Sequence, residues 1–595
     1  MLKNSFAAIC IITSLTACGS NEQPYQSLPC IDSSRAFAIP SPAWGNAEHF
    51  APPPGDKAYE LVQKIRPTWA KQLHLAGGWS HMPTVIIPLS QKAESVDPSK
   101  IAWFGSSQDG NLKKIEVIQT VELMDEGRSL VLKLKSPLYP QVQRVVVAVL
   151  EGAVTGANAM AVCGPDAKAY DDYFVALDEL PSQVHAQLAL PFTLSNEYLA
   201  LGALFDRLNE SPVFQLESME AKPLDELGAK EPGPEVAESM QPIGARGILS
   251  IPDYRGEDGL MTLSADGAPA EKGTTKPGIV VTLPAQGQPP YPVLLFQHGG
   301  TGDKADFLAW ADELANAGFA IVSIDLPFHG DRAGPQGGTD MDILDFQNLL
   351  ATRDNLRQAA ADHMAVLTGI DELNDSLQPI FNTPVTLDKN KIFYMGISLG
   401  ALTGSLTFSC SRNLSAAALF VGAANFGELV RYGVFSMFIG DVLRSAPIEV
   451  EVLLALAEVL MDGGDPGTYA IRAEDRSQAP RPILLFQAVD EAIIDVPVSD
   501  FWGLCFGADL ASPFDHKVQG MDEIALPGGK NFSWADGEQK ATRLLIQNPM
   551  VDFDPSARHG ALIKTGYSQQ QAVSCFSSFL STGHCEVIDS GYMDH

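Results

Sequence analysis

Short apolar runs alternate with amphipathic stretches along the second half of the chain. Each run is bounded by polar or turn residues, as is typical of buried strands in a parallel sheet covered by helices on both faces. The predicted strands are 278–283, 293–296, 320–324, 391–395, 416–420 and 483–486, and helices are predicted at 306–317 and 343–367. This alternation predicts an α/β domain with a mostly parallel sheet over residues 246–595.

A different pattern occupies the first half of the chain. β-rich runs separated by turn residues recur at short intervals, at 83–88, 114–119, 129–134 and 144–150. This spacing predicts a small β-sandwich. We expect a β-sandwich-like domain with a helical extension over residues 55–215, followed by a Glu-, Pro- and Gly-rich linker at 216–245.

The N-terminus has the features of an export signal. Lys3 precedes an apolar run over residues 6–15 that is too short to span a bilayer, which predicts a signal peptide at 1–17. Leu-Thr-Ala before Cys18 resembles the bacterial lipobox. This resemblance implies that Cys18 is acylated and anchors the protein to a membrane through a lipidated tether at 18–54. Gly rather than Asp follows the cysteine, so we expect an outer-membrane lipoprotein on the periplasmic or the cell-surface side.

Charge and composition restrict the possible partners. The chain of 595 residues has a formal net charge of −32, which repels nucleic-acid phosphates and argues against a nucleic-acid partner. No CxxC pair or His-rich cluster has metal-ligand spacing, so we expect no metal and no other cofactor. Up to three disulfides are possible among the cysteines that follow Cys18, and their pairing cannot be read from the spacing: Cys30, Cys163, Cys410, Cys505, Cys575 and Cys585.

The candidate nucleophile is Ser398, in the motif Gly396-Ile-Ser-Leu-Gly400. The motif follows a predicted strand and opens a predicted helix, and its glycines allow the tight turn that exposes the serine hydroxyl. A serine needs a histidine base and an acid to orient it, in the chain order nucleophile, acid, histidine. His559 is predicted as the base, in a loop between a predicted strand and the helix 568–580.

The acid is expected just after the strand that ends near residue 487. Asp490 lies at the carboxyl end of that strand and is our choice, Glu491 is the alternative, and Asp495 is a weaker third. The other late histidines, His516, His584 and His595, are interpreted as structural or solvent-facing.

An oxyanion hole needs backbone N–H groups that face the reacting carbonyl oxygen. Leu399, next to the nucleophile, is predicted to supply one. The second is expected from the glycine-rich loop His298-Gly-Gly-Thr-Gly302, with Gly300 as first choice and Gly299 next. No Lys-Ser/Thr pair follows these glycines as in a phosphate-binding P-loop, so nucleotide binding is not expected.

Taken together, these segments and Asp325-Leu-Pro-Phe-His-Gly330 resemble the α/β-hydrolase superfamily. The layout of lipobox, N-terminal β domain and hydrolase domain is similar to the VolA-like surface lipoprotein lipases and lysophospholipases of Gram-negative bacteria. Arg353-Asp-Asn-Leu-Arg-Gln358 and His559-Gly-Ala-Leu-Ile563 carry the same likeness. The resemblance implies a serine carboxylic-ester hydrolase that acts on lipid or other acyl esters without a cofactor.

An insertion between the predicted strand 416–420 and the acid covers about residues 425–478. Residues 448–461 within it are apolar on nearly all sides, which suits a cap that contacts an acyl chain or a membrane, or helices that are buried against the core. Two alternative functions stay open. One is an esterase for short-chain or polymeric esters, and the other is a surface-binding lipoprotein without activity.

Overall fold

The computed structural model describes residues 28–589 except 29, 33, 42–43, 45–49, 51, 54, 107–110, 139–141, 164–166, 229–242, 285–286, 310–311, 334–338, 382–383, 439–446, 476–478 and 535–538. The predicted signal peptide, Cys18 and most of the predicted tether lie outside these residues. Within the described part of the chain, no helix is both long and apolar enough to cross a membrane.

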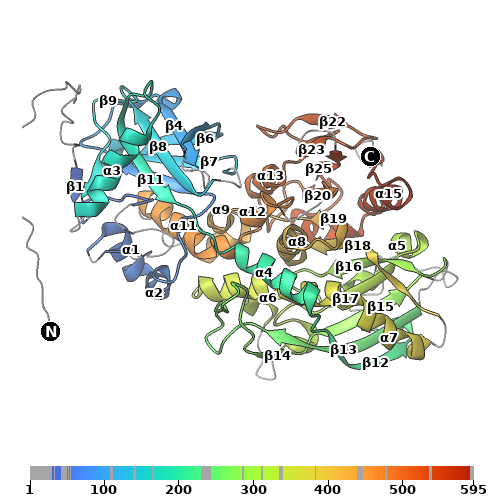
Figure 1. The fold of residues 1–595 in the computed structure, drawn as a ribbon. Coiled ribbons are helices and arrows are strands. Elements are labelled where there is room, and N and C mark those ends of the chain that lie inside the picture. The colour runs from blue at the N-terminus through green and yellow to red at the C-terminus, as the bar shows by residue number, and fades with distance from the viewer. Residues whose placement is uncertain are drawn as a thin grey trace, which may run out of the picture.

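One large mixed sheet organises the second half of the chain (Figure 1). In pairing order its strands are β12 (Gln215–Lys222), β13 (Ile243–Asp253), β15 (Gly278–Leu283), β17 (Ala320–Ile324), β16 (Tyr291–Gln297), β18 (Leu387–Ile397), β19 (Leu414–Phe420), β20 (Ile483–Ala488), β25 (Arg543–Asn548), β21 (Asp509–Ser512) and β22 (Glu523–Ala525). Pairing is antiparallel from β12 to β17 and parallel from β17 to β22. The predicted α/β class and each predicted strand of this half are confirmed.

Helices cover both faces of this sheet and thereby bury its strands on both sides. Along β16, Val293 and Leu295 pack into one core with α8 (Leu399–Cys410), whereas Leu294 and Phe296 pack into another with α15 (Gly566–Thr582). Successive side chains of a strand point to opposite faces, so a continuous apolar run fills two cores at once. Helix α6 (Leu349–Thr368) packs beside α8. The predicted helix 306–317 is instead a 3₁₀ turn, Asp306–Ala309, followed by α5 (Asp312–Asn316).

Two antiparallel sheets occupy the region predicted as a β-sandwich. One contains β2 (Thr84–Pro88), β7 (Ser129–Leu134) and β6 (Gln119–Met124). The other contains β11 (Ala186–Thr193), β8 (Arg144–Leu150), β4 (Ile101–Ser106) and β5 (Lys113–Ile115). Buried residues of both sheets, including Leu132 and Val147, belong to one hydrophobic core.

Two predicted boundaries in the first half are wrong. The predicted strand 114–119 is divided between β5 and β6, which pair in different sheets, and Ile118 between them donates its N–H to Ser136 Oγ at 2.9 Å. Residues 216–222 and 243–245 of the predicted linker lie in β12 and β13, which pair with each other, and its residues 229–242 are outside the described residues. The polar composition of this segment fits an edge strand, whose outer side faces solvent, as well as a linker.

The described cysteines include both disulfide-bonded residues and thiols. Cys575 in α15 is joined to Cys585 by a disulfide, and Cys30 is also disulfide-bonded. Cys410 and Cys505 are buried thiols, so fewer than three disulfides form among the six cysteines.

Helix α11 (Pro447–Met461) lies between the N-terminal sheets and the half of the chain that contains the large sheet (Figure 1). It packs on α2 (Pro67–Leu73), α9 (Phe426–Arg431) and α6. Polar links also cross this junction: Lys133 Nζ lies 2.8 Å from Glu451, and the buried His81 Nδ1 lies 3.1 Å from Asp462. Residues 448–461 are buried apart from the half-buried Glu449, and Met461 at their end also lines the pocket around Ser398.

Histidine 363 gives the core a defined response to acid. Burial lowers its pKa from 6.5 to about 3, with Arg332 adding a smaller effect. Below pH 6.5 the unfolded chain therefore binds a proton at this histidine that the folded chain does not bind. The free energy of unfolding is thus highest above pH 6.5 and falls as the pH decreases. We expect a loss of roughly 2 kcal/mol in the free energy of unfolding between pH 7 and pH 5 from this residue.

Urea unfolding of the wild type and of His363→Gln, which does not titrate, measures that contribution. The variant is expected to be less stable at pH 7 and to lose less stability at pH 5. Equal pH dependence in the two proteins would contradict the prediction.

Candidate active site

Ser398 lies at the turn between β18 and α8, with backbone angles φ 55° and ψ −118°. A positive φ is uncommon for a residue with a Cβ and indicates local strain of the kind found at functional sites. The Ser398 N–H donates to the Phe420 carbonyl at 2.9 Å, which ties the turn to β19. The predicted strand–turn–helix context of the nucleophile is therefore present.

Both glycines of the motif are required by close packing. A Cβ on Gly396 would collide with the Gly400 carbonyl, and a Cβ on Gly400 would collide with the Gln297 carbonyl at the end of β16. The Tyr394 hydroxyl donates to the Gly400 carbonyl at 2.7 Å and holds the first turn of α8 in place. The turn can thus be tight only because these two positions carry no side chain.

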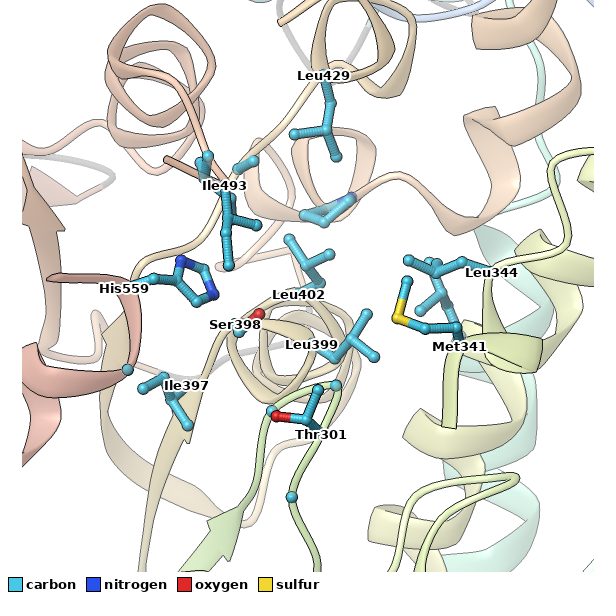
Figure 2. Close-up of a pocket in the computed structure, with 18 of the residues that line it drawn as sticks. Thr301, Met341, Leu344, Ile397, Ser398, Leu399, Leu402, Leu429, Ile493 and His559 are labelled. Carbon is cyan, nitrogen blue, oxygen red and sulfur yellow. The ribbon is translucent and has the colours of Figure 1, made fainter. Parts of the chain in front are cut away.

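His559 faces Ser398 across a shared pocket (Figure 2). It lies in a short helix, α14 (Pro555–Ala561), where the sequence predicts a loop. Its side chain is 11 % exposed, and its Nδ1 lies 2.8 Å from Glu491 Oε1. The carboxylate therefore holds the ring so that Nε2 is left for the serine side.

Glu491, rather than Asp490, is the carboxylate that orients His559. Its side chain is 1 % exposed and also accepts hydrogen bonds from the N–H groups of Ile493, at 2.7 Å, and Ile494, at 2.9 Å. These three contacts fix the position of the carboxylate. His559 therefore contacts Glu491, the second candidate for the acid, and not Asp490, the first choice.

The conformation of the turn after β20 explains why Glu491, and not Asp490, reaches His559. Asp490 has φ 55° and an exposed side chain, so the left-handed backbone turns this carboxylate to solvent and directs the next residue toward His559. Asp and Asn tolerate this conformation better than most residues, which accounts for an aspartate here without a catalytic role. Asp495 caps α13 (Val496–Cys505) by accepting from the Val496 N–H at 2.8 Å.

The other predicted histidines lie away from this arrangement. His516 Nε2 lies 2.9 Å from Asp500, and His584 is exposed near the end of α15. His595 is outside the described residues.

Gly300 and Leu399 meet beside the nucleophile, as predicted for oxyanion donors. A Cβ on Gly300 would lie 3.3 Å from Leu399 Cδ1, and one on Gly299 would lie 3.2 Å from Ser398 Cβ. Leu399 is the first residue of α8, so its N–H has no acceptor within the helix and points along the positive end of the helix dipole.

His298 sets the orientation of the Gly300 N–H. The Leu326 N–H donates to His298 Nε2 at 3.1 Å, so the ring proton is on Nδ1, which lies 2.8 Å from the Gly299 carbonyl and donates to it. The carbonyl of Gly299 and the N–H of Gly300 point in opposite directions because the peptide between them is planar and trans. In the sequence this histidine is recognised only as the first residue of the glycine-rich loop.

The pocket around Ser398 has a volume of about 490 Å³ and is lined mainly by apolar side chains. Leu429 and Ile397 lie on opposite sides of Ser398, so the pocket extends both ways from the nucleophile (Figure 2). The side near the insertion is lined by Leu402, Phe426, Leu429, Val434, Phe435 and Met461. Met341 and Val434 are 44 % and 43 % exposed, which leaves an apolar rim.

The side chains around Ser398 combine a hydroxyl, an imidazole and a carboxylate. Among the described residues, no group of three or more His, Cys, Asp or Glu side chains is placed to hold a metal ion. A serine that shares a pocket with a histidine and its orienting carboxylate, beside a glycine-rich loop and a helix N-terminus, is an arrangement that can carry out acyl transfer.

Comparison with known proteins gives limited information. No family model and no curated protein matches this chain. Similar solved structures include acetyl xylan esterase 1 from Thermoanaerobacterium sp., with 13 % identity over 55 % of this chain and 85 % of that chain at a TM-score of 0.31. A glucuronoyl esterase from Teredinibacter turnerae matches with 12 % identity over 71 % of this chain and 93 % of that chain at a TM-score of 0.32.

A third similar structure is an acylaminoacyl peptidase in complex with a chloromethyl ketone. It has 13 % identity over 85 % of this chain and 70 % of that chain, at a TM-score of 0.31. These scores are too low to support a functional assignment, so the geometry around Ser398 is the basis for one.

Proposed function

We propose that this protein is a serine carboxylic-ester hydrolase with a Ser398–His559–Glu491 triad. The observation that carries the proposal is the hydrogen bond of 2.8 Å between His559 Nδ1 and Glu491, on a histidine that faces a strained serine in the same pocket. Neither the strained serine nor the paired histidine is needed for a core alone, and their convergence in a cavity favours catalysis.

The proposed reaction proceeds in two steps. His559 Nε2 takes the Ser398 proton as Oγ attacks the ester carbonyl, and the N–H groups of Leu399 and Gly300 stabilise the oxyanion. Collapse of the tetrahedral intermediate releases the alcohol, which receives the proton from His559. Water, deprotonated by His559, then attacks the acyl-enzyme and releases the carboxylic acid. Glu491 stabilises the imidazolium in both steps.

For the substrate we propose an acyl ester of a lipid, as in lipases and lysophospholipases. The volume of the pocket is in the range of sites for small organic ligands, and its insertion side offers apolar walls for a hydrocarbon chain. An esterase for short-chain or polymeric esters is the second candidate, because Ile397 lines the pocket on the other side of Ser398 from Leu429 (Figure 2).

Two measurements test the proposal on the wild-type protein. A fluorophosphonate probe is expected to label Ser398, identified by peptide mass spectrometry, and His559→Ala is expected to abolish labelling. Release of fatty acid from lysophospholipid, phospholipid and triglyceride then identifies the substrate. Failure to label and to cleave p-nitrophenyl esters would favour an inactive surface-binding lipoprotein instead.

Leu429→Trp is expected to change chain-length preference. Leu429 lines the insertion side of the pocket, and an indole there takes up space that a long acyl chain needs. We expect kcat/KM for p-nitrophenyl palmitate to fall about tenfold or more, since blocked burial costs about 0.8 kcal/mol per CH₂, while p-nitrophenyl acetate is cleaved at the wild-type rate. An equal loss for both esters would place the acyl chain elsewhere.

We also propose that Cys18 is acylated and that the protein is an outer-membrane lipoprotein. The support is the Leu-Thr-Ala-Cys sequence and the Gly that follows it. Metabolic labelling with an alkyne analogue of palmitate is expected to modify the wild type and not Cys18→Ala. Membrane fractionation then measures the location.

A further inference from the structure

The side of the pocket on which His559 lies has to receive the alcohol part of the ester. In the proposed reaction His559 gives its proton to the leaving alcohol, so the ester oxygen must come within hydrogen-bond reach of His559 Nε2. Figure 2 shows His559 on the same side of Ser398 as Ile397 and Ile493. The alcohol part therefore extends from the carbonyl carbon toward this side of the pocket.

The acyl part is directed to the other side. In the tetrahedral intermediate the carbonyl carbon carries Ser398 Oγ, the oxyanion, the leaving oxygen and the acyl carbon. The oxyanion faces the glycine-rich loop and the leaving oxygen faces His559, so the acyl carbon points away from both. Leu402 and Leu429 of the insertion side lie in that direction (Figure 2). The two parts of the ester thus meet different walls of one pocket.

The wall near His559 is made of isoleucine side chains, which we term the isoleucine wall. All four isoleucines of the pocket lining belong to it: Ile397, Ile493, Ile494 and Ile563. Ile397 directly precedes the nucleophile, and Ile563 follows His559 by four positions, about one helical turn. Ile494 and Ile563 are buried, whereas Ile397 and Ile493 are half-buried and present part of their surface to the pocket.

The isoleucine wall is fixed to the catalytic residues through the main chain. The N–H groups of Ile493 and Ile494 donate to the Glu491 carboxylate at 2.7 and 2.9 Å, and the same carboxylate lies 2.8 Å from His559 Nδ1. One turn therefore holds both the acid and two of the apolar side chains. The position of these side chains relative to the His559 ring is set by the same hydrogen bonds that orient the ring.

Few side chains on this wall can form hydrogen bonds with a substrate. Among the described residues that line the pocket at 493–494 and 559–564, the polar side chains are those of His559 and Lys564, and Lys564 is exposed. The hydroxyls of a sugar or a glycerol would lose hydrogen bonds to water here without replacing them. A hydrocarbon chain instead gains about fourfold in binding for each CH₂ that is buried.

We propose that the alcohol part of the substrate is hydrophobic and that the isoleucine wall selects it. The chemical class is an ester of a fatty alcohol or of a diacylglycerol, in contrast to an ester of a sugar or of a glycerophosphate headgroup. This inference deepens the proposed function and rests on it, because it takes His559 as the group that protonates the leaving alcohol.

Octanoate esters with one acyl chain and different alcohols test the proposal on the wild-type protein. Methyl, butyl and hexyl octanoate have the same ester chemistry, so their kcat/KM values in the same detergent micelles report contacts of the alcohol part. We expect kcat/KM to rise about tenfold or more from methyl to hexyl. Octanoyl lysophosphatidylcholine and octanoyl glucose are expected to be cleaved about tenfold more slowly than hexyl octanoate. Trioctanoylglycerol, compared with hexyl octanoate, distinguishes a diacylglycerol from a fatty alcohol.

Ile493→Ser tests the isoleucine wall itself. The substitution shortens a half-buried side chain and keeps the N–H that donates to Glu491. We expect the ratio of kcat/KM for hexyl octanoate to that for methyl octanoate to fall about fivefold or more. A purely structural effect would lower both values and leave the ratio unchanged. Ile588→Ser is the matched control, because Ile588 is exposed and absent from the pocket lining, and it is expected to keep the wild-type ratio.

Three results would contradict the proposal while leaving the ester hydrolase intact. They are equal kcat/KM values along the alcohol series, faster cleavage of the lysophosphatidylcholine or glucose ester than of hexyl octanoate, and an unchanged ratio in Ile493→Ser. If the wild type cleaves neither p-nitrophenyl esters nor any octanoate, the proposed function is wrong and the inference about the alcohol is wrong with it.

Discussion

Ser398→Ala is expected to reduce kcat for ester hydrolysis by a factor on the order of 10⁶ and to leave the fold intact. The loss is large because the substitution removes the atom that forms the acyl-enzyme, and His559 and Glu491 have no function in acyl transfer without it. The strain at φ 55° is also no worse for Ala than for Ser, so the melting temperature is expected to change little. Initial rates with a p-nitrophenyl ester, together with circular dichroism, measure both quantities.

Ser409→Ala is the control for this substitution. Ser409 is a buried serine on the same helix, α8, and is absent from the pocket lining. It is expected to retain wild-type kcat. Comparable loss in both variants would show that the serine at 398 matters for the helix and not for the chemistry.

Glu491→Gln is expected to lower kcat about 10³- to 10⁴-fold, whereas Asp490→Asn is expected to change it less than about twofold. The amide keeps the shape of the side chain but carries no charge to stabilise the imidazolium of His559, and it can present the wrong group to Nδ1. Asp490, one residue away, is exposed on a left-handed turn and does not contact the ring. The two isosteric substitutions therefore separate the candidate acids. A loss of activity in Asp490→Asn with full activity in Glu491→Gln would reverse the assignment and contradict the observed hydrogen bond.

Much of the parallel sheet could be predicted because its strands are apolar on both faces. The run Leu294-Leu-Phe296, for example, has no polar position at which a helix or an exposed strand would face solvent, and it is buried between two cores. Ser398 and His559 could be predicted because chain order and the strand–turn–helix context restrict them. These signals can be read from short segments of the sequence and do not depend on tertiary pairing.

The errors arose where backbone direction or tertiary pairing decides the outcome. Which carboxylate reaches His559 depends on a left-handed turn at Asp490, and composition does not determine the handedness of a turn. Residues 215–222 have the polar composition of a linker because β12 is an edge strand of the described sheet. The contact of His329 with the Gly300 carbonyl joins two loops that are 29 positions apart, so the order of residues alone does not predict it.

The polar links between the N-terminal sheets and the second half of the chain impose an order on folding. Lys133 and Glu451 are 318 positions apart, and His81 and Asp462 are 381 positions apart. During synthesis the N-terminal sheets are complete long before α11 is made. The surface of these sheets that contacts α11 therefore stays exposed to solvent until that helix has been synthesised. Contacts of such sequence separation slow folding and prolong exposure to aggregation. A chaperone that shields this surface is therefore expected to raise the yield of the full-length protein, and separate expression of residues 246–595 is expected to leave Glu451 without Lys133 and Asp462 without His81.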